Sequence, residues 1–455
     1  MSDQIVSDSL LNIDIEQIMQ SKDAEHFKYE VTISSPLGDV IVPFLNTIEW
    51  TRDYNGAATD DLRVIFSLDG GLYKDIIMDY KEHLEITIVK KSKDVVVDST
   101  RYKFIILKDT GTNFKQVMNV ATSSQLSSFV PVDIEGQCID MDLYSLDDIQ
   151  IEGIYKNTDL KSVIESEMLE SIDKINYGEH KSDISLNITN VDNTNSFRHV
   201  TIPTGTKILD LPEYLQQSDS YGLFNSSVGT YLQKYNGKKY LYVYPTMDIK
   251  QYDLVENKAM IFVSNNKRLG TAGTTFMSDG KLIKIIADPN IEKLEDGNNR
   301  LFKGGNAITY SNPDNVYKSY RNIDNGNTLS GKKDTNIKTI STKDMKDGTV
   351  KSKYLGTINN AYKYRSETLR DSLTIYKLNW HNGDIDVIYP GMPCCFIYED
   401  NKNNIYKLKG NIISTAQVYT PDTKVNRCLI NIAVMSQDVY MDQDEYDTGL
   451  KTNKD

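Results

Sequence analysis

The side chains best suited to nucleophilic or metal chemistry are few in this chain and lie far apart in the sequence. Adjacent Cys394 and Cys395 would point to opposite faces of a strand, so one metal ion could not easily bind both. No C-x-x-C pair, H-E-x-x-H motif or G-x-S-x-G turn occurs. We therefore predict buried thiols and ordinary surface histidines, with no metal and no cofactor. The other residues considered are Cys138, Cys428, His26, His83, His180, His199 and His381.

The acidic residues form no recognisable catalytic pair. Four side chains resemble a loose calcium loop, but their spacing does not match an EF-hand and favours a turn: Asp53, Asn55, Asp60 and Asp61. Glu165, Glu167 and Glu170 are interpreted as the solvated face of a helix. A glycosidase needs only two well-placed carboxylates, so the abundance of acids leaves that activity open. The sequence also lacks a G-x-x-x-x-G-K-[ST] phosphate loop.

One aromatic cluster stands out among the 29 tyrosines: Tyr231, Tyr235, Tyr240, Tyr242 and Tyr244. Such rings could form a platform for sugar binding. Strand alternation places Tyr240, Tyr242 and Tyr244 on one face, which is also the pattern of a buried sheet face or subunit interface. We favour packing over sugar binding. With no nucleophile paired to a base, the chain is predicted not to be an enzyme.

The composition of the chain limits its possible fold and function. A chain of 455 residues predicts two to four domains, and 39% hydrophobic content is enough for packed cores. The formal net charge of −13 argues against tight binding of nucleic acid, which requires clustered Lys and Arg. The N-terminal sequence is acidic where a signal peptide would be basic, and no segment has the length of a membrane span. A protein without a membrane anchor, made in the cytoplasm, is expected.

The first 113 residues predict a small β domain. After a weakly helical arm over residues 1–25, apolar residues alternate over 26–34, 40–50, 62–68, 84–89 and 101–108. Leu84, Ile86 and Ile88 share one face of their strand and are predicted core or interface positions. Five or more short strands within about 90 residues are typical of a barrel or sandwich. We place the first β-barrel at 26–113.

The middle of the chain, 114–250, has mixed α/β character. Apolar residues at helical spacing predict a helix over 158–172, with Thr158 as a plausible N-cap and Asp159 against the helix dipole. Residues 209–234 are predicted to be largely helical. Asn236 and Gly237 then predict a hairpin turn before the aromatic strand 239–244.

The C-terminal part is predicted to contain a second β unit. Residues 251–360 form a mixed segment, in which the polar stretch 312–352 reads as a long exposed insertion. A helix is predicted over 357–371, followed by strands at 373–378, 394–399, 405–414 and 428–434. We therefore place a helix and a second β-barrel at 361–436, and a polar tail at 437–455. The predicted class is β-rich α+β, with two small β-barrels flanking an α/β middle segment.

Three segments, in this order, resemble the trimeric baseplate hub family of contractile-tailed bacteriophages. In the first, LRVIFSLDGGLYKDIIMDYKEHLEITIVKK precedes RYKFIILKDTG. The second is IPTGTKILDLPEYLQQSDSYGLFNSSVGTYLQKYNGKKYLYVYPTMD. The third has a Pro-Gly turn at Pro390 and Gly391, then CCFIYEDNKNNIYKLKGNIISTAQVY and CLINIAVMS. Together they cover about half of the chain. The spike proteins of type VI secretion systems are similar in fold.

The resemblance implies a structural protein of the phage virion. In that family each subunit has two tube-type barrels, so a homotrimer forms a pseudo-six-fold ring. Such a ring would be a symmetry adapter between the six-fold tail tube and the three-fold central spike, beside other baseplate proteins. It would assemble in the host cytoplasm, and DNA would cross its acidic lumen during ejection without binding tightly. Tyr240, Tyr242 and Tyr244, and the turn at 390–391, would be barrel or interface positions.

Two other functions remain open from the residues alone. One is a tail-associated cell-wall hydrolase or a carbohydrate- or receptor-binding tail protein, which an acidic pair in a cleft would favour. The other is a tube or tail-completion protein, which a six-fold assembly would indicate.

Overall fold

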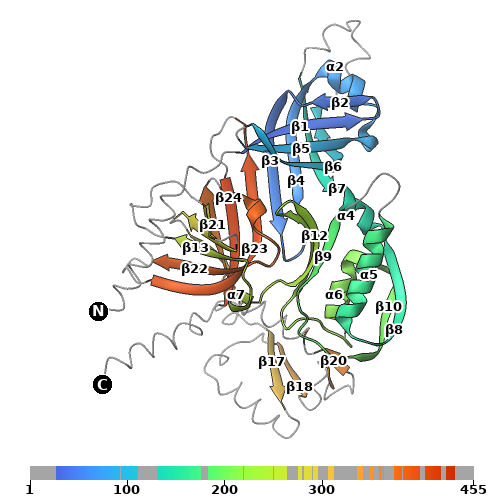
Figure 1. Cartoon of the computed structure of the whole chain (residues 1–455), viewed down its shortest axis with the longest axis vertical. Helices are drawn as coiled ribbons and strands as arrows, with labels where there is room; N and C mark the ends of the chain where they lie inside the picture. The colour runs from blue at the N-terminus through green and yellow to red at the C-terminus, as the bar shows by residue number, and fades with distance from the viewer. Residues whose placement is uncertain are drawn as a thin grey trace.

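The computed structural model contains three regions that differ in secondary structure (Figure 1). Blue N-terminal strands lie at the top of the view, orange-red C-terminal strands lie on the left, and the green helices of the middle segment lie on the right. The structure describes residues 27–92, 94–110, 131–175, 183–218, 220–248, 251–263, 275–278, 281–288, 291–295, 306–311, 336–341, 349–351, 358–360, 362, 373–381, 383–399, 405–421 and 427–435.

Strands from both ends of the chain form one 15-stranded sheet. Its path runs β14-β15-β13-β22-β23-β3-β4-β7-β6-β5-β1-β2, and β24, β21 and β16 branch from β23. The two halves meet where β23 pairs antiparallel with β3, from Ser414 opposite Asp53 to Tyr419 opposite Ile48. The predicted β-rich α+β class is confirmed.

The N-terminal half of this sheet curls back on itself. Seven strands in the order β3-β4-β7-β6-β5-β1-β2 would place β3 and β2 about 29 Å apart if the sheet were flat. Only Val42 and Pro43 connect those two strands, and three Cα steps span at most about 11 Å. The unit comprises β1 (Phe27–Ser35), β2 (Gly38–Ile41), β3 (Phe44–Asp53), β4 (Asp61–Asp69), α2 (Gly70–Leu72), η1 (Tyr73–Ile77), η2 (Lys81–His83), β5 (Glu85–Ser92), β6 (Val95–Asp109) and β7 (Pro131–Asp140).

Two features of this half bear on the sequence predictions. Leu84, Ile86 and Ile88 are all buried in the main core, on the shared face that alternation predicts. The boundary at residue 113, in contrast, was too early. Residues of strand β7 fall in the predicted middle segment, but the strand pairs with both β4 and β6 and completes the N-terminal sheet.

The C-terminal half includes strands from residues 251–360, which were predicted to form a separate mixed segment. Parallel β13 joins β15 to β22, so residues 258–263 and 282–287 belong to this unit, whereas the predicted boundary lay at 361. The N–H of Asp288, just after β15, donates to the carbonyl of Asn379 on β21 at 2.9 Å and links the far strands. The unit comprises β13 (Lys258–Val263), β14 (Thr275–Ser278), β15 (Leu282–Ala287), β16 (Glu292–Glu295), β21 (Leu373–His381), η8 (Ile385–Val387), β22 (Pro393–Glu399), β23 (Ile405–Tyr419) and β24 (Arg427–Met435).

The middle segment packs helices against two small sheets, β10-β8 and β11-β12-β9. Residues 228–235 form strand β11 rather than the predicted helix, because they pair along their whole length with β12. The hairpin turn is confirmed: Asn236 and Gly237 both have positive φ, 50° and 80°, as a type I′ turn requires. The elements are α4 (Met141–Asp147), β8 (Gln150–Thr158), α5 (Leu160–Lys174), β9 (Ile184–Ile188), β10 (Phe197–Lys207), η4 (Ile208–Asp210), α6 (Leu211–Gln217), β11 (Val228–Tyr235), β12 (Lys238–Pro245) and α7 (Gln251–Leu254).

Strand β12 separates two hydrophobic cores. Tyr242 and Tyr244 are buried in the main sheet core, with Tyr240 partly buried against it. Leu241 and Val243 point the other way, into the core of the middle segment. The alternation predicted from the sequence therefore serves two packed faces, and the single strand couples the middle segment to the main sheet.

Several predictions fall on residues outside the described ranges. These are the arm 1–25, most of the insertion 312–352, most of the helix 357–371 and the tail 437–455. Within the insertion and its flanks, β17 (Asn306–Ser311) pairs with β18 (Asn336–Ser341), and β19 (Thr349–Lys351) with β20 (Ile358–Asn360). Among the described helices, none is both long and apolar enough to cross a membrane.

Helix α5 begins one residue later than predicted, because Asp159 rather than Thr158 is its N-cap. The Asp159 carboxylate accepts hydrogen bonds from the backbone N–H and the hydroxyl of Ser162, at 2.9 and 2.8 Å. These bonds, the backbone one first, lower the pKa of Asp159. A carboxyl group with a lowered pKa stabilises the fold above its unfolded pKa and loses that contribution as the pH falls through the folded value.

We expect Asp159→Ala to lower the free energy of unfolding by about 1 kcal/mol at pH 7. The difference from the wild type should shrink as the pH falls below about 4, where the unfolded carboxyl group begins to take up a proton. Urea unfolding at pH 7 and pH 3 measures this. Asp159→Asn is the control, since it keeps the cap without the titrating group. An Ala variant equally destabilised at both pH values would contradict the expectation.

Candidate functional site: a buried polar junction

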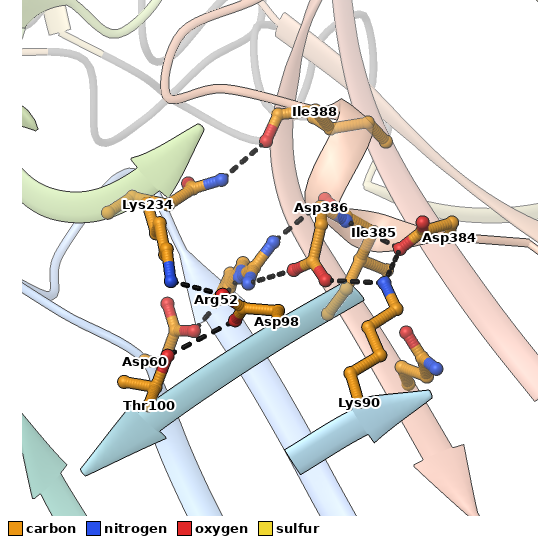
Figure 2. A network of polar contacts seen from close by, with 12 residues as sticks. Arg52, Asp60, Lys90, Asp98, Thr100, Lys234, Asp384, Ile385, Asp386 and Ile388 are labelled. Carbon is orange, nitrogen blue, oxygen red and sulfur yellow. Dashed lines mark hydrogen bonds and ion pairs between the residues drawn. The ribbon is translucent and has the colours of Figure 1, made fainter. Parts of the chain in front are cut away.

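Arg52 is a buried cation at the centre of a network of polar contacts between distant segments (Figure 2). Strand β3 alternates so that Arg52 follows Ile48 and Trp50 on the inward face, and it is only 5% exposed. A buried guanidinium requires partners, and this one has three. Nε donates to Asp60 at 3.0 Å, Nη1 to the Ile385 carbonyl at 2.7 Å, and Nη2 to Asp386 at 2.7 Å.

Lys90 is the second buried cation and reaches the same segment from β5. It continues the inward face of Ile86 and Ile88 and is 6% exposed. Its ammonium donates to Asp384 at 2.8 Å and to Asp386 at 2.7 Å, and lies 4.0 Å from the centre of the Phe27 ring. Asp386 thus accepts from both cations, one on each carboxylate oxygen, and joins β3 and β5 to helix η8 (Figure 2).

The β11-β12 hairpin supplies the third side of the junction. Lys234 on β11 donates to Asp98 on β6, which also accepts from Thr100 at 3.1 Å (Figure 2). The Tyr231 hydroxyl donates to Asp60 at 2.8 Å. Gln233 donates to the carbonyl of Ile388 at 2.6 Å. The N-terminal sheet, the middle hairpin and the C-terminal η8 turn are therefore connected by charge-assisted hydrogen bonds at one place.

Burial and pairing push the pKa values of the carboxylates in opposite directions. Burial raises the pKa of Asp60 despite its bond to Arg52. Burial and the neighbouring Asp386 raise the pKa of Asp384. The Asp386 pKa is held below its usual range, because its two cations outweigh the effect of burial. For Lys90, burial alone would lower the pKa, but Asp386 and Asp384 raise it.

A cleft of about 240 Å³ opens onto this network. Asp384 and Asp386 line it with side chains that are 21% and 43% exposed, so water can reach them. Cys138 also lines the cleft, and burial raises the pKa of its thiol far above the usual value, so it stays protonated. Arg52 and Lys90 neutralise the two carboxylates, and the arrangement acts chiefly as a joint between segments.

The residues singled out from the sequence occupy other positions. Tyr240, Tyr242 and Tyr244, with Pro390 and Gly391, line a second groove beside β12. The suspected calcium loop is a turn, in which the Asn55 N–H donates to Asp53 at 2.9 Å, while Asp60 is taken up by Arg52. Within the described ranges, no group of three or more His, Cys, Asp or Glu could hold a metal ion.

Sequence analysis missed the four charged residues that make the junction: Arg52, Lys90, Asp384 and Asp386. A signal existed for the two cations, because each continues an apolar period-two face, Ile48-Trp50-Arg52 and Ile86-Ile88-Lys90. Nothing comparable marks the two aspartates, which lie in a turn.

Comparison with known proteins gives structural neighbours only. No known family description matches the sequence, and no curated protein matches it. A tail protein from Neisseria meningitidis MC58 aligns over 91% of this chain and 99% of its own, with a TM-score of 0.45 and 10% identity. The 43 kDa tail protein of prophage MuSo2 from Shewanella oneidensis aligns over 90% of this chain and 100% of its own, with a TM-score of 0.45 and 10% identity. A chain of the Francisella PdpA–VgrG complex aligns over 96% of this chain and 62% of its own length, with a TM-score of 0.42 and 11% identity.

Proposed function

We propose that this chain is a structural hub subunit of a bacteriophage tail baseplate and not an enzyme. In this proposal it acts as a homotrimeric symmetry adapter, with the six-fold tail tube on one side and a three-fold central spike on the other. The proposal starts from the resemblance of three segments to the hub family, and the arrangement of the sheet supports it.

The observation that carries the proposal is the edge-to-edge pairing of β3 with β23. This pairing holds an N-terminal and a C-terminal β unit side by side within one chain. Three such chains would supply six β units, which is the number needed to match a six-fold tube. The polar junction fits the same role, because it fixes the angle between the two units through Arg52 and Lys90.

The charge of the chain agrees with a channel that DNA crosses. A formal net charge of −13 opposes phosphate binding, so DNA would pass without being retained. We place acidic residues of the β units on the wall of that channel.

Native mass measurement of the full chain tests the proposal. We expect a particle of three times the chain mass, which binds a trimeric spike protein when the two are mixed. A six-fold particle would instead indicate a tube or tail-completion protein. A monomer that does not bind the spike would refute the hub assignment.

The alternative of a cell-wall hydrolase is favoured by one observation, the carboxylates Asp384 and Asp386 in the same cleft with pKa values shifted in opposite directions. Glycosidases use two carboxylates that differ in this way. Lys90 bridges this pair, however, and would have to be displaced before either oxygen could meet a substrate. Peptidoglycan zymography of the wild type and of Asp384→Asn separates the two functions, and we expect no clearing from either.

A further inference from the structure

The groove lined by Tyr240, Tyr242 and Tyr244 has the features of a small-molecule site. Its volume is about 580 Å³, within the range of ligand pockets. It lies where the β11-β12 hairpin and β9 meet α7 and the turn at 389–393. Sites of this size commonly occur at such boundaries between packed units.

Tyrosine rings make up its aromatic wall. Tyr235 meets Tyr389 edge-on, with ring centres 5.6 Å apart, and Tyr242 stacks on Tyr389 at 6.4 Å. Tyr240 lies 5.6 Å from Tyr242. Tyr242 is buried, whereas Tyr235, Tyr240 and Tyr389 remain partly accessible from the groove. The accessible rings offer flat apolar faces beside their polar hydroxyl groups.

The rest of the lining mixes apolar residues, chiefly prolines, with polar side chains and is almost without charge. Asn187, Thr189, Gln251 and Asn257 contribute amide and hydroxyl groups. Among the described residues, the amide of exposed Asn187 makes no hydrogen bond within the protein. Glu256 is the one charged side chain in the described lining, and it pairs with Lys281. An anionic ligand would therefore meet no cation in the groove.

We propose that this groove binds a neutral oligosaccharide. The C–H faces of sugar rings would pack on the accessible tyrosines, chiefly Tyr240 and Tyr389, and the sugar hydroxyl groups would exchange hydrogen bonds with the Asn187 amide. Packing alone accounts for buried Tyr242 and Tyr244. Three partly accessible rings remain, beside an exposed amide that is available to bond a ligand. This site is independent of the hub assignment.

Saturation-transfer NMR and calorimetry on the full chain test the proposal, with chitotriose and maltotriose as neutral probes. We expect saturable binding of at least one of them, weakened about tenfold by Tyr240→Ala through loss of a stacking face. Asn187→Leu is a second variant, and because its side chain is exposed it should fold normally. Tyr144→Ala, at a tyrosine 48% exposed elsewhere, is the matched control and should bind as the wild type does.

Two results would overturn the proposal. The first is that neither trisaccharide binds, and binding of hexaproline in that case would indicate a peptide groove instead. The second is that Tyr240→Ala and Asn187→Leu bind sugar as tightly as Tyr144→Ala. None of these measurements depends on whether the chain forms trimers, so this test and that of the hub assignment fail separately.

Discussion

Arg52→Ala is expected to lower the free energy of unfolding by about 3–5 kcal/mol, the cost of breaking a buried ion pair. The change would remove the common partner of Asp60 and Asp386, and the carbonyl of Ile385 would keep only the Ile388 N–H as a donor. Both the N-terminal and the C-terminal β units should lose stability, because the guanidinium on β3 bonds to residues more than 300 positions away. Urea unfolding followed by circular dichroism measures it.

A matched control is available on the neighbouring strand. Arg63 on β4 pairs with Asp61 at 3.2 Å, but both side chains are more than 40% exposed. Arg63→Ala should therefore cost only about 0–1 kcal/mol. Arg52→Lys should fall between the two, since lysine keeps the charge but cannot reach three acceptors in one plane. If Arg52→Ala cost no more than Arg63→Ala, the junction would not hold the units together.

Gly391→Ala is expected to destabilise the chain by about 2–5 kcal/mol. One part is backbone strain of about 1–2 kcal/mol, because Gly391 has a φ of +71°. The other part is overpacking of about 1–3 kcal/mol, because a Cβ atom would lie 2.4 Å from the ring of buried Tyr244. Thermal unfolding of the purified variant measures the sum.

Gly237→Ala separates the two parts. Gly237 has a similar φ of +80°, but a Cβ atom there would meet nothing within 4 Å. It should therefore show the strain alone, and the difference between the two variants gives the packing cost against Tyr244. Equal losses in both variants would mean that the Tyr244 ring moves aside freely.

The strands were largely predictable from the sequence, whereas their partners were not. Alternation over residues 84–89 and 239–244 placed the correct side chains on one face, because that pattern depends only on local geometry. Residues 228–234 misled the prediction, since a strand held by a hairpin partner overrides weak helical spacing. Strands β7 and β13 belong to the main sheet because they pair with segments distant in the sequence, and local periodicity does not predict such pairing.

Pairing between distant segments also explains why one candidate site was visible in the sequence and the other was not. The tyrosines of β12 are recognisable from the sequence because they alternate within five residues. Arg52 and Asp386 are 334 positions apart, and each looks like an ordinary surface charge until the fold brings them together. A charged residue that continues an inward-facing apolar alternation is the one local sign of such a buried pair, and Arg52 and Lys90 both show it.

The pairing of β3 with β23 also has a consequence for synthesis of the chain. While the ribosome is still translating the middle segment, β3 has emerged but its neighbour on one side does not yet exist. An open strand edge of this kind readily pairs with the wrong chain. We therefore expect co-translational folding to halt at an N-terminal intermediate, and completion to wait for the last strands. That order would make nascent chains sensitive to crowding on polysomes and dependent on chaperones that shield strand edges.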